Sequence, residues 1–296
     1  MAGNITFLVL AMLNLALLFT STQGGQIAIY WGQNQNGNEP SLAATCATGD
    51  YNIVILSSLT TFFFPGLTPE LNLPGHCDWP NGNCTALGND ISVCQGQGVK
   101  VFLSLGGPSG RYQLSSPEDA TSFAEYLWKN YLNGQSDTPR PLGNAVLDGI
   151  DFDIEVGTSS LYWDALATNL KAFDKNVILS ASTHCYFPDY LLGTAIGTGL
   201  FDYVWVRFYN QQDAGCEYLG GSIDGLISSW NQWNLSLANQ IFLGLGASPD
   251  IDGYMRPYVL ISQVLPKVKY SSKYGGVMLW NKDFDNGYST IIKNYV

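Results

Sequence analysis

The chain has 296 residues, of which 46% are hydrophobic, and its 24 acidic and 13 basic residues give a formal net charge of −11 at pH 7. This composition excludes a disordered chain, because it supplies enough apolar and aromatic side chains for a large core. The negative charge argues against nucleic acid and anionic membrane surfaces as partners. The length suits one large domain or two small ones.

The first 24 residues contain no Asp, Glu, Lys or Arg, and the run 5–18 is almost wholly apolar. The small residues of the segment TSTQGG, at 20–25, follow it. This order is typical of a secretory signal peptide, although the usual basic start is missing. A membrane anchor is the alternative, but the apolar run is short for a bilayer span. We therefore predict a signal peptide at 1–24 and a secreted, extracellular domain at 25–296, without a membrane segment and monomeric.

The rest of the chain alternates β-like runs with helical segments. Eight runs are expected to form strands, at residues 26–31, 52–59, 99–105, 145–154, 177–182, 202–209, 240–245 and 275–280. Helical segments are expected at 117–132, 159–173, 190–198, 223–232 and 257–268. Eight strands, each followed by a helical stretch, predict a closed parallel (β/α)8 TIM barrel of the α/β class. A doubly wound open sheet is the alternative, but no GxGxxG turn follows the first strand.

The cysteines indicate a disulfide framework, because disulfides persist in secreted proteins. The spacing favours one local pair, Cys77 with Cys84, around the turn-rich segment DWPNGN. Metal binding is the alternative. With 2 histidines in the chain and no CxxC pattern, we expect no metal site and no other cofactor.

The segment LDGIDFDIE, at 147–155, carries the predicted chemistry. Side chains alternate faces along a strand, so Asp151, Asp153 and Glu155 share one face. Desolvation and mutual repulsion raise the pKa of at least one carboxyl in such a series. Glu155 ends the predicted strand, at the rim where barrel active sites lie. We predict that Glu155 is the general acid on a glycosidic bond. A solvated edge strand is the alternative.

The eight-residue segment DGIDFDIE resembles the signature of glycoside hydrolase family 18. The segments IAIYWGQN, SLGG, DYVWVRFYN, WNQW, IFLGL and YGGVMLW resemble the acidic endochitinases of plant class III, in the same order. The resemblance runs from about residue 25 to 296. It implies endo-acting hydrolysis of chitin or chitooligosaccharides, without a cofactor, by a plant defence protein of the apoplast.

The resemblance also implies a retaining mechanism in which the substrate's N-acetyl group replaces a protein nucleophile. It assigns proton transfer to Glu155 and support of the acetamido group to Asp153. Asp151 would share a proton with Asp153, and the Tyr209 hydroxyl would donate to the acetamido carbonyl.

The resemblance further implies aromatic contacts with the sugar at the cleaved bond. Trp280 would form the floor of that subsite and Tyr30 would line it. For Trp280, simple burial at the end of a barrel strand is the alternative. The implied disulfide pairs are Cys46–Cys94, Cys77–Cys84 and Cys185–Cys216.

Arg207 departs from the family pattern, which has glutamine there. It has the same parity as Tyr209, so it should point into the same site. A guanidinium beside Asp153 and Glu155 would favour ionised carboxylates, lower their pKa and could clamp one of them, which opposes a protonated general acid. The alternative is that Arg207 lies at the rim and binds sugar hydroxyls.

Other cleft segments also depart from the pattern. His184 follows the fifth strand, and we expect a packed or rim side chain there rather than a new base. Phe62 and its neighbours could contact sugars or a protein partner, with burial as the alternative. Two functions therefore remain: an active endochitinase, or a chitinase-like lectin or inhibitor of secreted glycosidases with little catalysis.

Overall fold

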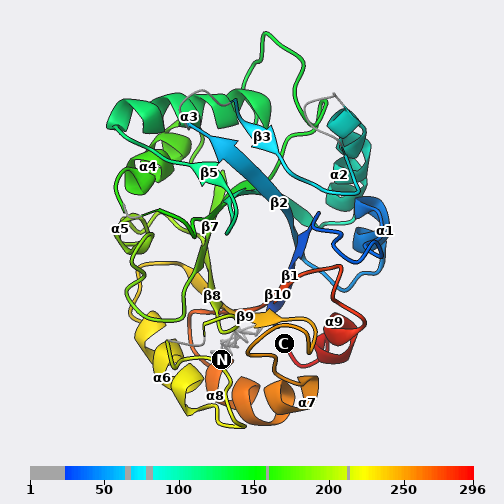
Figure 1. Ribbon diagram of the computed structural model, residues 1–296, viewed down its shortest axis with the longest axis vertical. Coiled ribbons are helices and arrows are strands. Elements are labelled where there is room, and N and C mark those ends of the chain that lie inside the picture. Colours follow the sequence, from blue (N-terminus) through cyan, green and yellow to red (C-terminus); the bar gives the residue numbers. More distant parts are fainter. Residues whose placement is uncertain (1–23, 64–67, 78–82, 158–159, 212–213) are drawn as a thin grey trace, which may run out of the picture.

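The computed structural model describes residues 24–63, 68–77, 83–157, 160–211 and 214–296. Apart from Gly24, the predicted signal peptide lies outside the described residues. Across them, eight parallel strands close into a barrel, because β1 pairs with both β2 and β10 (Figure 1). In chain order these strands are β1 (Gln26–Trp31), β2 (Ile53–Phe62), β4 (Lys100–Gly106), β6 (Gly149–Asp153), β7 (Ile178–Thr183), β8 (Tyr203–Arg207), β9 (Gln240–Gly246) and β10 (Tyr274–Trp280). The predicted (β/α)8 barrel is confirmed.

Two short strands extend the far end of β2. β3 (Glu70–Leu71) pairs with it antiparallel and β5 (Arg111–Tyr112) pairs with it parallel, both at residues 59–62. They lie outside the closed ring and were not expected from the sequence. They matter for the site because β5 brings the loop after β4 back against the rim of the barrel.

Helices surround the barrel in Figure 1. They are α1 (Leu42–Ala47), the 3-10 turn η1 (Asn83–Ala86), α2 (Leu87–Gly96), α3 (Pro117–Asn130), α4 (Trp163–Phe173), α5 (Gly193–Ile196), α6 (Asp224–Trp233), α7 (Pro257–Val259), the π-helical η2 (Leu260–Val264), α8 (Leu265–Val268) and α9 (Tyr288–Ile292). No helix among the described residues is long and apolar enough to cross a membrane.

The helix ends follow local capping chemistry. The α3 helix begins where the Ser116 hydroxyl accepts from the Asp119 amide, with proline in the first turn. The α5 helix is shorter than the predicted 190–198, and the Asp189 carboxylate accepts the amides of Leu191 and Leu192 in the turn that precedes it. The short α1 and α9 were not predicted, since neither has the length for a clear helical period.

Two apolar layers result from the strand pleat. Outward-facing side chains pack against the helices, whereas inward-facing ones fill the barrel. The inner layer holds Ala28, Tyr30, Ile53, Ile55, Phe102, Trp205, Tyr209, Phe242, Ile251 and Met278. Most of these side chains lie below the ends of the strands and fill the barrel among the described residues.

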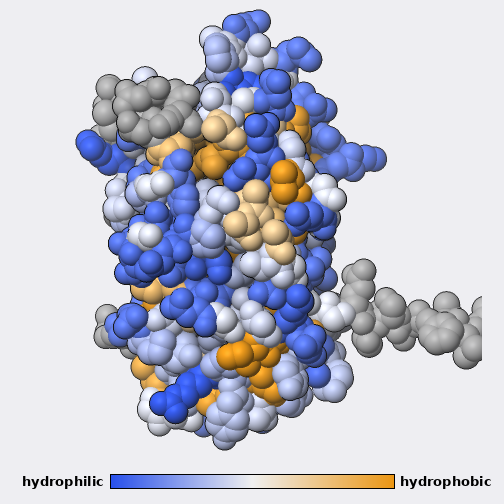
Figure 2. All heavy atoms as spheres, turned by 90° about the vertical axis from the view of Figure 1, so that its right-hand side faces the viewer, coloured by the Kyte–Doolittle hydropathy of each residue, from blue (hydrophilic) through white to orange (hydrophobic). Residues whose placement is uncertain are grey.

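The described residues contain the three disulfide pairs that the resemblance implies. Cys46–Cys94 joins α1 to α2, Cys77–Cys84 closes a short loop, and Cys185–Cys216 joins the segments after β7 and β8. Such bonds typically contribute about 2–4 kcal/mol each. Figure 2 shows the side that carries α1, α2 and α9, where the surface is mostly hydrophilic with small, separate apolar patches.

Candidate active site

Asp151 is fully buried inside the barrel and accepts hydrogen bonds at both carboxylate oxygens. The donors come from four different strands: the Tyr30 hydroxyl at 2.8 Å, the Ser104 hydroxyl at 2.8 Å, the Ser180 hydroxyl at 2.6 Å and the Trp205 indole N–H at 2.8 Å. Burial raises the pKa of Asp151 above its ordinary value, and these hydrogen bonds oppose the rise. Asp153 is not among these donors. That Asp151 and Asp153 share a proton therefore stays a prediction.

Asp153 is the next inward-facing residue and ends β6. It is 2% exposed, and its Oδ1 atom has no hydrogen-bond partner among the described residues. Burial raises the pKa of Asp153 well above its ordinary value, and the charge of Glu155 adds to the rise. Arg207 acts in the opposite direction without outweighing them. Arg207 therefore acts on the pKa of Asp153 in the expected direction, but burial and the neighbouring carboxylates keep that pKa raised.

Glu155 lies two residues beyond the end of β6 rather than in the strand. Its backbone is held by Tyr112 of β5, whose hydroxyl accepts from the amides of Glu155 at 2.9 Å and Val156 at 3.1 Å. The same hydroxyl donates to the Gly107 carbonyl at 3.0 Å. Tyr112 thus ties the loop after β4 to the segment that carries Glu155. No pattern in the sequence indicated this role of Tyr112.

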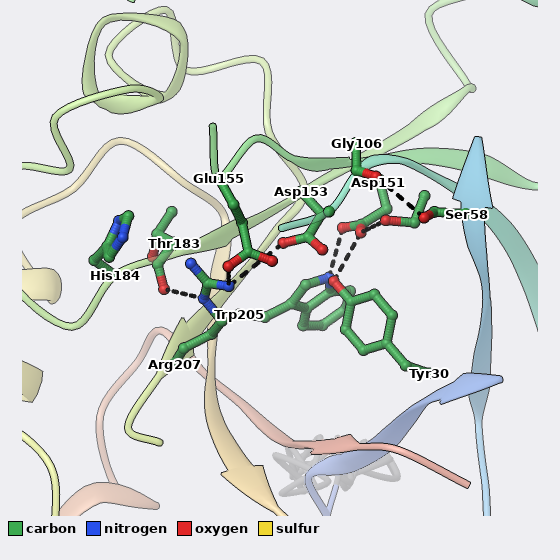
Figure 3. Close-up of polar contacts among 12 residues, drawn as sticks. Tyr30, Ser58, Gly106, Asp151, Asp153, Glu155, Thr183, His184, Trp205 and Arg207 are labelled. Atoms are coloured by element: carbon green, nitrogen blue, oxygen red, sulfur yellow. Dashed lines mark hydrogen bonds and ion pairs between the residues drawn. The ribbon is translucent and has the colours of Figure 1, made fainter. Parts of the chain in front are cut away.

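Arg207 ends β8 and points at the carboxylates (Figure 3). Its Nη1 atom forms an ion pair with Glu155 and lies 3.8 Å from Asp153 Oδ1. Its Nε atom donates to the Thr183 carbonyl at 3.3 Å. Burial acts to lower the pKa of Arg207, but the two carboxylates more than compensate. At 5% exposure, Arg207 is buried beside Glu155 and not placed at the rim.

A pocket of about 350 Å³ opens above these groups. Asp153, Glu155, Arg207, Tyr209 and Trp280 contribute to its wall, together with Gln35, Pro108, Asn210 and Gln211 from the surrounding loops. Burial raises the pKa of the Tyr209 hydroxyl well above its ordinary value, so that it remains a donor near neutral pH. The structure thus brings together the catalytic residues expected from the sequence, except that Asp151 lies one layer deeper.

The two expected sugar contacts differ in depth. Trp280 is half-buried and lines the pocket. Tyr30 is fully buried and lies beneath the pocket, where its ring centroid is 5.2 Å from that of Trp280. Its hydroxyl donates to Asp151, so Tyr30 supports the site from below and does not line it. Parity placed Tyr30 on the correct face but could not give its depth.

The neighbouring departures from the family pattern have structural roles. His184 Nδ1 lies 3.0 Å from Asp189 Oδ2, and its ring stacks on Tyr186. This is the packed rim position expected for it. Phe62 is fully buried and stacks on Tyr112 and Phe123, which agrees with burial rather than sugar contact. Phe64, its neighbour in the same segment, lies outside the described residues.

No group of three or more His, Cys, Asp and Glu side chains in the described part of the chain is arranged to hold a metal ion.

Comparison with known proteins identifies the family of the chain. Residues 26–249 match the model of the glycosyl hydrolases family 18. The chain is 55% identical over 300 residues to the acidic endochitinase SE2 of Beta vulgaris, covering 100% of this chain and 99% of that protein. The crystal structure of the chitinase ICChI from Ipomoea carnea superposes with a TM-score of 0.87 at 50% identity, covering 92% and 100% of the two chains. A xylanase and α-amylase inhibitor protein from Scadoxus multiflorus superposes with a TM-score of 0.84 at 40% identity, covering 92% and 99%. The chain therefore belongs to the glycosyl hydrolases of family 18.

Proposed function

We propose that this protein hydrolyses β-1,4 links between N-acetylglucosamine units inside chitin chains, with retention of the anomeric configuration. The observation that carries the proposal is the meeting of Asp153, Glu155, Tyr209 and Trp280 around one pocket. The family membership and the acidic endochitinases among its relatives support the substrate class. The predicted signal peptide and the disulfides support secretion into the apoplast, with a role in plant defence.

The first step breaks the bond between the anomeric carbon and the bridging oxygen. Glu155 gives its proton to that oxygen while the acetamido carbonyl oxygen of the same sugar bonds to the anomeric carbon. The ring nitrogen of the resulting oxazolinium ion carries positive charge. Its N–H group donates a hydrogen bond to the Asp153 carboxylate. Tyr209 donates to the carbonyl oxygen and orients it for attack. Trp280 offers an indole face for the sugar ring.

The second step restores Glu155. Its carboxylate takes a proton from a water molecule, whose oxygen bonds to the anomeric carbon as the oxazoline ring opens. The incoming water takes the face from which the leaving sugar departed, so the configuration is retained. The acetamido group attacked and then left, so no bond to a protein atom forms.

Hydrolysis of chitohexaose, followed by proton NMR during the first turnovers, tests this proposal. We expect the β-anomer first and products from internal cleavage. Early accumulation of the α-anomer would contradict the mechanism. Release of single sugars from one end would contradict endo action.

A second function is favoured by one contact, the ion pair between Arg207 and Glu155. This pair needs an ionised Glu155, whereas the first step needs a protonated one. In this case the protein would have little catalysis and would bind chitooligosaccharides or inhibit secreted glycosidases. The name of the Scadoxus relative describes that protein as an inhibitor of xylanase and α-amylase. Tight binding of chitohexaose without turnover, or inhibition of a xylanase or an α-amylase, would favour it.

A further inference from the structure

Ser182, on β7, lies one inward-facing layer above Ser180. The register of β6 and β7 pairs Asp151 with Ser180, and the Ser180 hydroxyl donates to Asp151 at 2.6 Å. Parallel strands keep their register from one layer to the next, so the following inward-facing pair is Asp153 with Ser182. A second serine hydroxyl therefore lies beside the second carboxyl of the series.

Both members of this second pair are buried with unused hydrogen-bonding capacity. Ser182 is 2% exposed, and its Oγ atom has no hydrogen-bond partner among the described residues. The same holds for Asp153 Oδ1. A buried polar atom without a partner is costly. Two of them on neighbouring side chains indicate a hydrogen bond that forms in another state of the site.

The Ser182 hydroxyl has two acidic groups near it. Burial raises the pKa of Asp153 and of the Tyr30 hydroxyl, and the Ser182 hydroxyl acts to lower both. A serine hydroxyl has one hydrogen, so it donates to one acceptor at a time. A carboxylate is a stronger acceptor than a neutral phenol. Ionisation of Asp153 therefore turns the Ser182 hydroxyl towards Asp153.

The charges around Asp153 leave this role to Ser182. The titratable groups that act on Asp153 come from β1, β5, β6 and β8 and from the residue after β6: Tyr30, Tyr112, Asp151, Arg207, Tyr209 and Glu155. Burial raises the pKa of the three tyrosines, so they are uncharged near neutral pH. Glu155 and Asp151 raise the pKa of Asp153. Arg207 lowers it but is paired with Glu155.

We propose that Ser182 is a positioning residue for Asp153. In the ionised state of Asp153, the Ser182 hydroxyl donates to Oδ1 and leaves the second carboxylate oxygen for the acetamido N–H of the substrate. This inference rests on the proposed function, in which Asp153 accepts that N–H. Ser182 does not belong to the wall of the active-site pocket, so it acts through Asp153 and not on the sugar.

An aryl chitobioside tests this role with little demand for proton transfer. Its phenolate departs with little help from Glu155, so the rate depends on the acetamido attack that Asp153 supports. In Ser182→Ala the ionised Asp153 loses a donor, so the acid limb of the kcat profile should move up by about one pH unit. On that limb kcat should fall about ten-fold. The KM should stay unchanged, because the pocket wall is intact.

Thr45→Val is the matched control. Thr45 of α1 also carries a buried hydroxyl without a partner among the described residues, and it lies outside the wall of the active-site pocket. Its pH–rate profile should match that of the wild type. Ser182→Cys keeps a weaker donor and should lie between the wild type and Ser182→Ala. An unchanged acid limb in Ser182→Ala, or a rise in KM alone, would overturn the role of Ser182.

A wild-type protein that is inactive at every pH would instead overturn the proposed function. Carbon-13 NMR of the aspartate carboxyl groups decides the role of Ser182 in that case as well. The Asp153 signal, assigned by its loss in Asp153→Asn, should titrate about one pH unit higher in Ser182→Ala than in the wild type. Equal titration of Asp153 in the two proteins rejects the proposal.

Discussion

Asp151 is the inner end and Glu155 the rim end of the series Asp151, Asp153 and Glu155. The two ends differ in the contacts that position them. Asp151 is fully buried and receives hydrogen bonds from β1, β4, β7 and β8, so the barrel itself fixes it. The side chain of Glu155 is 19% exposed. One tyrosine, Tyr112 of β5, accepts its backbone amide, and one arginine, Arg207, pairs with its carboxylate. The inner end therefore belongs to the fold, whereas single substitutions can alter the rim end (Figure 3).

The largest expected effect comes from Glu155→Gln, which keeps the size of the side chain and removes its proton. Chitohexaose hydrolysis should fall at least about 100-fold, the low end for general acid catalysis. Binding measured by calorimetry should largely survive, because the rest of the pocket is intact. Turnover close to that of the wild type would refute Glu155 as the acid.

Arg207→Gln tests whether the ion pair between Arg207 and Glu155 slows proton transfer from Glu155. A neutral amide no longer forms an ion pair with the Glu155 carboxylate, so hydrolysis near pH 7 should rise about ten-fold, equivalent to about 1.4 kcal/mol. Arg207→Lys keeps the charge and should stay close to the wild type. Weaker chitohexaose binding with an unchanged pH–rate profile would show that Arg207 binds sugar instead.

The same contrast explains what the sequence could predict. Apolar runs and the alternation in 147–155 were sufficient for the barrel and for the shared face of Asp151 and Asp153, because strand parity fixes both. The end of β6 was not predictable, since the Glu155 amide bonds to a tyrosine 43 residues away in sequence. Parity also could not show that Tyr30 lies one layer below the pocket.

Tyr112→Phe tests the backbone support of Glu155. The ring and its stacking on Phe62 remain, but the amides of Glu155 and Val156 lose their acceptor. We expect kcat to fall about five-fold, equivalent to about 1 kcal/mol, with KM for the aryl chitobioside nearly unchanged. Tyr274→Phe is the control, because its buried hydroxyl has no hydrogen-bond partner among the described residues. A change in KM alone would indicate a binding role for Tyr112 instead.

The smallest expected effect is on stability. It concerns Asp153, which lies between Asp151 and Glu155 in the carboxylate series. Its pKa is raised well above the ordinary value, so the folded protein keeps a proton that the unfolded chain releases above about pH 4. This contribution to the free energy of unfolding is complete at lower pH and is lost as the pH rises through the folded-state pKa. Asp153→Asn cannot titrate, so its melting temperature should fall less than that of the wild type between pH 5 and pH 8. A difference of 1 kcal/mol corresponds to about 2–4 °C in a domain of this size, which calorimetric melting resolves. A variant whose melting temperature follows the wild-type pH dependence would show that Asp153 is already ionised in the folded protein, held so by Arg207.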